Sequence, residues 1–351
     1  MDFIKTSSEN LYLSIHTIGY ETKGESTVIS FYSKSPECRM HYVCVIDSYE
    51  LEGENITDKV LKDIFKDYPR NRKKIDLLCW THPDEDHTVG LDQLIDQYID
   101  INTKISSPLY ALFHPQNECS KVVAEKIHSL SKGRNINKRQ PLVPMSEDGE
   151  IDKRGIELAN KLKIPVKFTH VGPYANLYAN ALNNYEPNKL SPMILLDING
   201  FNLIFGGDCH NYTIRRGENM IPKSVSFVKI PHHGSKSSDF LADALESNES
   251  EIISCTSKFN KILPDSEVLN KYIRLSKAIS ITSNEIPNSE NYKFVTEGLS
   301  FKNVNMTKDL YGIIHYEICL SNLEKNTSGV RKIMPTTVKH FGKASKVAQI
   351  V

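Results

Sequence analysis

The pattern of apolar and polar positions predicts a mixed α/β protein from the first third of the chain. Three segments rich in β-branched and aromatic residues, separated by Gly, Ser and Pro, are predicted strands: 11–18, 27–32 and 41–46. Apolar residues recur at helical spacing over 56–68, and Pro69 ends that pattern. A short apolar run at 75–80 predicts a buried strand, and the spacing over 91–99 predicts an amphipathic helix.

The rest of the chain continues this alternation. Helices are predicted at 122–130 and 266–275, and a surface loop at 132–152. Asn199-Gly200 is typical of a hairpin turn. Further strands are predicted at 163–168, 193–197, 201–205, 225–230, 252–256, 278–282 and 312–320.

Four of the predicted strands end in histidine or aspartate. His82 follows the strand at 75–80, and His170, Asp208 and His232 follow three later strands. Catalytic groups often lie at such ends, because loops there are accessible while the sheet holds them in place. This repetition makes the strand ends the candidate site.

Composition narrows the classes of protein. The 351 residues carry 43 Lys and Arg against 43 Asp and Glu, so the net charge is zero and no global field attracts polyanions. The length suits one large α/β domain or two smaller ones. No apolar run is long enough for a membrane span, and the first residues do not have the pattern of a signal peptide. Seven scattered cysteines without a CxxC pair favour a reducing compartment, and we expect a cytoplasmic protein.

The loop after residue 80 carries four metal-ligand side chains in six positions, His82-x-Asp84-x-Asp86-His87. Imidazole and carboxylate are ligands for zinc, and manganese or iron accept the same set. A solvated acidic loop with two chance histidines is the alternative for this stretch alone. Taken singly, Asp208 could cap a turn, His170 could be a core histidine, and the pair His232-His233 could lie on the surface.

Taken together, these motifs resemble the metallo-β-lactamase fold hydrolases, and most closely the hydrolase domain of the competence protein ComEC and its stand-alone relatives. The matching stretches are VCVIDSYE (43–50), THPDEDHTVGLDQL (81–94), NKLSPMILL (188–196), LIFGGD (203–208) and VKIPHHGSKSS (228–238). The resemblance implies an αββα sandwich, with two mixed β-sheets flanked by helices and a metal site at the sheet edge. It spans roughly 11–320, so we expect a hydrolase domain at 1–321, a variable helical and loop segment at about 100–165, and a basic, partly disordered tail at 322–351.

The resemblance also implies a ligand set for two divalent metal ions, with Zn2+ first and Mn2+ or Fe as alternatives. A first ion would be held by three residues, in which aspartate takes the second histidine position of the family motif: His82, Asp84 and His170. A second ion would be held by Asp86, His87 and one of His232 or His233, of which we select His233. Asp208 would bridge the two ions, and Asp47 would orient a ligand by a hydrogen bond.

Two ions held in this way imply a metal-dependent hydrolase, because they can lower the pKa of a bridging water to about 7. The resulting hydroxide would attack phosphorus or a carbonyl carbon. We expect catalytic roles for Asp86, Asp208, His232 and His233. Ser235 and Lys236 are expected to contact the substrate.

The leading substrate is a phosphodiester in nucleic acid or a nucleotide, so the resemblance implies a phosphodiesterase or nuclease. Basic residues near the motifs support phosphate binding: Arg215, Arg216, Lys223, Lys229, Lys236, Lys132, Arg134, Lys138 and Arg139. Tyr174, Tyr178 and Tyr185 could stack on bases or simply pack. Two alternatives stay open: a hydrolase of non-nucleic esters or lactones, and an effector activated by a protein partner in a multi-protein system such as anti-phage defence. No membrane partner is expected.

Overall fold

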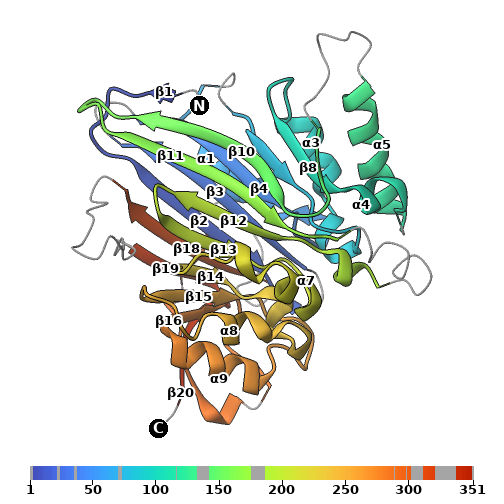
Figure 1. Ribbon diagram of the computed structural model, residues 1–351, viewed down its shortest axis with the longest axis vertical. Helices are drawn as coiled ribbons and strands as arrows, with labels where there is room; N and C mark the ends of the chain where they lie inside the picture. The colour runs from blue at the N-terminus through green and yellow to red at the C-terminus, as the bar shows by residue number, and fades with distance from the viewer. Residues whose placement is uncertain are drawn as a thin grey trace.

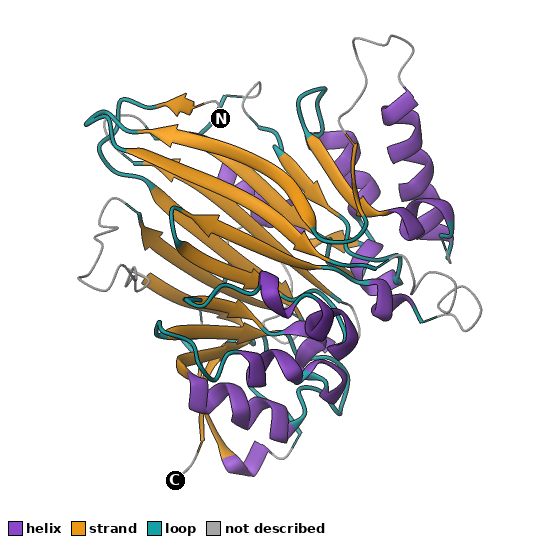
Figure 2. Ribbon diagram, in the orientation of Figure 1, coloured by secondary structure: helices purple, strands orange, loops and turns teal. Residues whose placement is uncertain are grey.

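Two large mixed sheets form the centre of the molecule, and helices lie on their outer sides (Figures 1 and 2). The computed structural model describes residues 3–21, 24–34, 38–69, 73–115, 117–132, 142–174, 186–287, 289–297, 299–301, 311–320 and 337–349. In this part of the chain, no helix is long and apolar enough to cross a membrane.

The first sheet has eight strands, antiparallel from β19 to β4 and parallel from β4 to β9. In spatial order they are β19 (Thr337–Gly342), β18 (Gly312–Cys319), β2 (Tyr12–Gly19), β3 (Glu25–Ser33), β4 (Arg39–Ile46), β7 (Leu77–Cys79), β8 (Lys104–Pro108) and β9 (Leu142–Met145).

The second sheet has ten strands, and its segment from β13 to β16 is parallel. In spatial order they are β1 (Phe3–Lys5), β10 (Gly149–Glu157), β11 (Lys163–Val171), β12 (Met193–Ile198), β13 (Phe201–Phe205), β14 (Phe227–Lys229), β15 (Ile252–Thr256), β16 (Ser276–Ile281), β20 (Ser345–Gln349) and β17 (Tyr292–Val295). A small ribbon, β5 (Glu50–Leu51) with β6 (Glu54–Asn55), precedes the first helix.

Helices complete the outer layers. The eight-stranded sheet shares a buried apolar cluster with α1 (Ile56–Phe65), α3 (Leu91–Tyr98), α4 (Leu109–Phe113) and α5 (Glu118–Lys132). The ten-stranded sheet shares another with α7 (Asn211–Arg216), α8 (Phe240–Ala244) and α9 (Ser266–Leu275). Side chains cap two of these helices: Asn55 accepts from the backbone of Asp58, and Asp265 accepts from Glu267 and Val268.

Alternation along the strands explains why both sheets are covered on two sides. In β4, Tyr42, Cys44 and Ile46 enter the core between the sheets, whereas Val43 and Val45 pack under the helices. β12 repeats the pattern, since Ile194, Leu196 and Ile198 face the central core and its other apolar residues face the outer layer. The predicted fold class, two mixed sheets flanked by helices, is therefore confirmed.

Two expectations about segments differ from the structure. The range 100–165 contributes strands to both sheets, and part of the loop predicted at 132–152 is β9 and the start of β10. The tail predicted at 322–351 contributes β19 and β20, each paired within a sheet. Both segments are rich in charged residues, yet their strands bury apolar side chains such as Ile151 and Val347.

Candidate metal centre

Strand ends from both sheets meet at the candidate site. The loop after β7 carries His82, the turn after β13 carries Asp208, and the turn after β14 carries His233. Gly207, in the turn before Asp208, has a φ of +51°, a conformation that glycine adopts without a steric penalty from a Cβ atom. In this turn, the backbone N–H of Asp208 donates to Ser191 Oγ, with 3.1 Å between nitrogen and oxygen.

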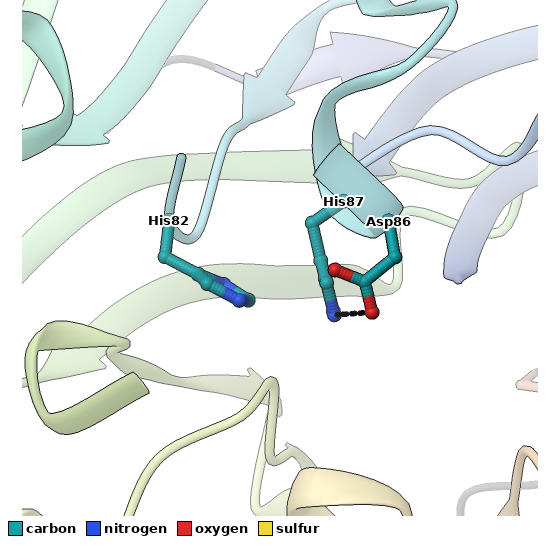
Figure 3. Close-up of side chains that lie close together, drawn as sticks. All are labelled: His82, Asp86 and His87. Atoms are coloured by element: carbon teal, nitrogen blue, oxygen red, sulfur yellow. Dashed lines mark ion pairs between the residues drawn. The ribbon is translucent and has the colours of Figure 1, made fainter. Parts of the chain in front are cut away.

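A buried tryptophan, Trp80, anchors the loop after β7 by a hydrogen bond. The indole N–H of Trp80 donates to Thr88 Oγ1 at 3.1 Å, and Thr88 Oγ1 donates to the backbone carbonyl of Asp84 at 2.6 Å. Between these anchors runs the short helix α2 (Glu85–Thr88). As a result, His82, Asp86 and His87 point their ligand atoms toward the same region (Figure 3).

The first group of potential ligands consists of His82, Asp86 and His87, whose ligand atoms all lie within 4.8 Å of one another. His87 Nε2 is 3.8 Å from Asp86 Oδ2 (Figure 3). The ring centroids of His82 and His87 are 4.2 Å apart. Asp84 lies close by, with its Oδ2 3.7 Å from His82 Nε2.

The second group consists of His87, Asp208 and His233, and it shares His87 with the first. The two oxygens of Asp208 face different rings: Oδ1 is 3.6 Å from His87 Nε2, and Oδ2 is 3.8 Å from His233 Nε2. Asp208 thus lies between imidazoles from opposite sheets, as a bridging carboxylate would.

Several buried polar atoms at this centre lack a hydrogen-bond partner among the described residues. They are Nε2 of His82, His87 and His233, and Oδ1 of Asp208, and Nε2 of His210, whose ring stacks on His232, is also unpartnered. One buried polar atom left unsatisfied costs about 1–3 kcal/mol, so a cluster of them calls for a ligand. Imidazole nitrogens and carboxylate oxygens form the donor set of zinc, manganese and iron sites, and these residues fit such an ion.

The buried histidines of the centre differ in their protonation. Burial lowers the pKa of His82 to about 3 and that of His233 to about 4, so both rings are neutral near pH 7. Burial also lowers the pKa of His87, but the carboxylates of Asp208 and Asp86 outweigh it and raise that pKa well above its usual value. Burial, with the nearby Asp208 and Asp84, raises the pKa of Asp86 to about 7. A cation here would replace the charge that a proton on His87 or Asp86 supplies.

Asp47 contacts Nδ1 of His87, the ring nitrogen that does not face the centre. Its Oδ2 is 2.8 Å from His87 Nδ1, and its Oδ1 accepts from the backbone N–H of Thr81 at 2.7 Å. Asp47 itself has a φ of +57°, and its side chain is buried. This bond directs His87 Nε2 toward the centre, and the role of Asp47 in orienting a metal ligand stays a prediction.

A buried polar network holds His233 in the same way. Its Nδ1 is 2.7 Å from Ser257 Oγ and 3.3 Å from Glu25 Oε2. Ser257 donates to Glu25, and Lys229 forms an ion pair with the same carboxylate; Glu25, Lys229 and Ser257 are all buried. Lys229 was expected near phosphate, but it lies in the interior with Glu25. Sequence spacing gave no signal for Glu25 or Ser257, because their contacts come from distant strands.

The two adjacent histidines have different surroundings. His232 already uses both ring nitrogens, Nδ1 at 2.8 Å from Ser237 Oγ and Nε2 at 3.1 Å from Asn188 Nδ2. His233 keeps Nε2 for the centre. The ring of His210, two residues after Asp208, stacks on His232 with centroids 5.0 Å apart. Sequence reasoning missed His210, although its closeness to Asp208 was a usable signal.

His170 is not brought into either group. It lies at the end of β11, and its Nδ1 is 2.6 Å from the carbonyl oxygen of Gly172. Its ligand role, like that of Asp84, stays a prediction.

The residues expected to bind substrate are engaged with other protein groups. Lys236 forms an ion pair with Glu267 at 2.7 Å, and Ser235 accepts from the backbone of Ser237. Arg216 pairs with Glu147 at 3.5 Å, and Arg215 lies 3.9 Å above the ring of Phe240. Five other expected contacts lie outside the described residues: Arg134, Lys138, Arg139, Tyr178 and Tyr185.

Comparison with known proteins gives distant structural likenesses only. No family model and no curated protein match the chain. Among solved structures, the metallo-β-lactamase fold protein YhfI from Bacillus subtilis is similar with a TM-score of 0.39 and 9% identity, over 77% of this chain and 95% of that one. A diphosphatase of the PhnP family has a TM-score of 0.37 and 13% identity, over 77% and 94% of the two chains. Zn2+-bound PqqB from Methylobacterium extorquens has a TM-score of 0.37 and 11% identity, over 73% and 84%. Likeness at this level carries no argument about activity, and the narrower resemblance to the ComEC hydrolase domain stays a prediction.

Proposed function

We propose that this protein is a metal-dependent hydrolase that cleaves phosphodiesters. The observation that supports it most is the pair of ligand groups sharing His87, with unpartnered, buried nitrogens converging on one carboxylate, Asp208. The motifs that resemble the metallo-β-lactamase hydrolases supply these same residues.

In this proposal, the chain would hold two divalent cations through His82, Asp86, His87, Asp208 and His233. When bound, such cations stabilise negative charge on phosphate oxygens and lower the pKa of a bound water. Asp47 and Ser257 fix the imidazoles of His87 and His233, so the ligand atoms need not reorganise when a cation enters.

His232 has a separate role in the proposed reaction. Its Nε2 is 3.9 Å from Asp208 Oδ2, and 19% of its side chain is exposed, whereas His233 is 1% exposed. In this proposal, Nε2 of this ring at the rim gives up its contact with Asn188 when substrate binds and, once protonated, donates to the leaving oxygen while Ser237 holds Nδ1.

The test combines metal content with a substrate panel. The protein would be purified natively, reconstituted with Zn2+, Mn2+ or Fe, and assayed on bis-p-nitrophenyl phosphate, lactones, and single- and double-stranded DNA and RNA. We expect bound metal and phosphodiester cleavage, both lost in Asp86→Ala and in Asp208→Ala with the fold retained. Asp96→Asn, an exposed acid on α3, is the control and should change neither. Absence of bound metal after reconstitution contradicts the proposal. If only lactones are hydrolysed, the protein is a metal-dependent hydrolase of carboxylic esters and not of phosphodiesters.

A further inference from the structure

A cavity of about 510 Å³ opens beside the metal-ligand candidates. Its walls include Glu50, Glu52, Glu85, Asp86, Val89 and Phe259. The glutamates come from the β5–β6 ribbon and from α2, and Phe259 follows β15. The cavity thus joins elements of the two sheets at the edge where the strand ends meet.

Two of these wall residues connect the cavity to the metal centre. Asp86 Oδ2 is 3.8 Å from Nε2 of His87, which is fully buried and has no hydrogen-bond partner among the described residues. The ring of Phe259 stacks on that of His233, with centroids 4.6 Å apart, and His233 Nε2 is equally unpartnered. A molecule in the cavity therefore lies directly beside the groups that would hold the cations.

The mouth of this cavity is negatively charged. In the described part of the chain, no lysine or arginine forms an ion pair with Glu50, Glu52 or Glu85. Gln93 donates to Glu50 at 3.2 Å, and burial, followed by the charge of Asp92, raises the pKa of Glu50.

The ammonium group of Lys258, which lies near the cavity, does not offset that charge. Lys258, the neighbour of Phe259 in sequence, is paired with Glu285 at 3.0 Å and lies 3.9 Å from Glu21. Two of the basic residues expected to bind phosphate are also paired, Lys236 with Glu267 and Arg216 with Glu147. A polynucleotide entering by this route would bring several phosphates past these carboxylates, which oppose its binding, whereas a small substrate brings only the phosphate that the cations receive.

We propose that this cavity binds a cationic group of the substrate, so that the substrate is a small phosphodiester bearing an ammonium or quaternary ammonium group. The inference rests on the proposed function. The glutamates attract the positive charge, and the Phe259 ring provides an aromatic wall for it. In the reaction, one P–O bond to the alcohol breaks and one P–O bond to the oxygen of water forms. One proton of that water goes to the leaving alcohol oxygen and the other to solvent, which yields a phosphomonoester and an alcohol without any redox change.

The experiment compares two esters that differ by one charge. These are p-nitrophenyl phosphorylcholine and its isostere p-nitrophenyl 3,3-dimethylbutyl phosphate, in which carbon replaces the quaternary nitrogen. Both carry the phosphate anion, and they are called the cationic and the neutral ester after the group at this position. Each exposed carboxylate contributes modestly, so three together should give a preference of roughly 10-fold in kcat/KM for the cationic ester. The triple variant Glu50→Gln, Glu52→Gln, Glu85→Gln should lose this preference and cleave the neutral ester within about 2-fold of wild type. Glu246→Gln, an exposed glutamate after α8, is the matched control and should keep the preference.

Three results would overturn the inference while leaving the proposed function intact: equal or faster cleavage of the neutral ester, an unchanged preference in the triple variant, or faster cleavage of oligonucleotides than of either ester. Loss of bound metal in the triple variant would overturn it as well, because the glutamates would then hold a metal cation themselves.

If neither ester, bis-p-nitrophenyl phosphate nor any oligonucleotide is cleaved, the proposed function fails, and calorimetry decides the inference separately. Phosphorylcholine would be compared with 3,3-dimethylbutyl phosphate on the Zn2+-loaded protein. Tighter binding of the cationic ligand, lost in the triple variant, supports the cationic subsite. Equal binding, or none, overturns it.

Discussion

The buried ion pair beneath His233 can be tested by removing one of its members. Lys229→Met keeps the length and apolar stem of the side chain but leaves Glu25 as an unpaired carboxylate in the interior, where both residues are less than 6% exposed. Breaking a buried pair in this way typically costs about 3–5 kcal/mol. This is a large share of the roughly 5–15 kcal/mol that stabilises a folded domain, so we expect a severely destabilised protein.

The double variant Glu25→Gln, Lys229→Met separates charge from packing. It has no buried charge at this position, and the amide can still accept from Ser257, so most of the lost stability should return. The assay is urea unfolding of the metal-free protein at pH 8, followed by fluorescence of Trp80 and by circular dichroism. Lys121→Met, which breaks the exposed pair with Glu118, is the control and should cost less than about 1 kcal/mol.

The pH dependence adds a second check. In the wild type, burial raises the pKa of Glu25, but Lys229 and then His233 outweigh it and lower that pKa below 4.5. The wild-type pair therefore stabilises the protein above that pH, and its contribution falls as the pH drops through the lowered pKa. Without Lys229, burial dominates and raises the pKa of Glu25, so the deficit of the variant should be largest at pH 8 and shrink toward pH 4.5. A loss below about 1 kcal/mol at pH 8, or a double variant no more stable than the single one, would refute the reasoning.

Three further predictions concern the ligands and one buried acid. His233→Ala should lose bound metal, whereas His232→Ala should retain metal and lose turnover, as checked by elemental analysis beside the phosphodiesterase assay. His210→Ala should lower metal content or activity more than His170→Ala, because His210 stacks on His232 and has a buried nitrogen without a partner among the described residues; equal losses would contradict this. Burial raises the pKa of Asp76 to about 6 from 3.8, so its ionisation removes roughly 3 kcal/mol of stability as the pH rises from about 4 to 6. Asp76→Asn should match the wild type in unfolding experiments at pH 4 and exceed it at pH 8, and an identical pH profile would be the negative result.

Much of the fold was predictable because most strands bury both faces. The strands around Val43 and Ile194 are apolar at nearly every position, and such runs stand out in a sequence. β10 was missed because its sequence, GEIDKRGIE, buries few apolar side chains, among them Ile151 and Ile156, between charged residues. The pairing of β10 with β11 decides its structure, and pairing is a non-local property.

The candidate site divides in the same way. His82, Asp86, His87 and Asp208 could be found because each lies at or just beyond a predicted strand end. Glu25 could not, since its contacts with Lys229 and Ser257 bridge more than 200 positions of sequence. Local patterns find the groups that face the centre, whereas the groups that support them depend on which strands become neighbours.

The last two described strands have a consequence for how the molecule is assembled. β19 belongs to the eight-stranded sheet and β20 to the ten-stranded sheet, with only Lys343 and Ala344 between them. β20 also lies between β16 and β17, so β17 joins its sheet only through a segment made later in translation. Each sheet gains its full set of described strands only after residues 337–349 have been synthesised, and the two-residue connection then links an edge strand of one sheet to an inner strand of the other. A chain ending at 321 would emerge with both sheets unfinished.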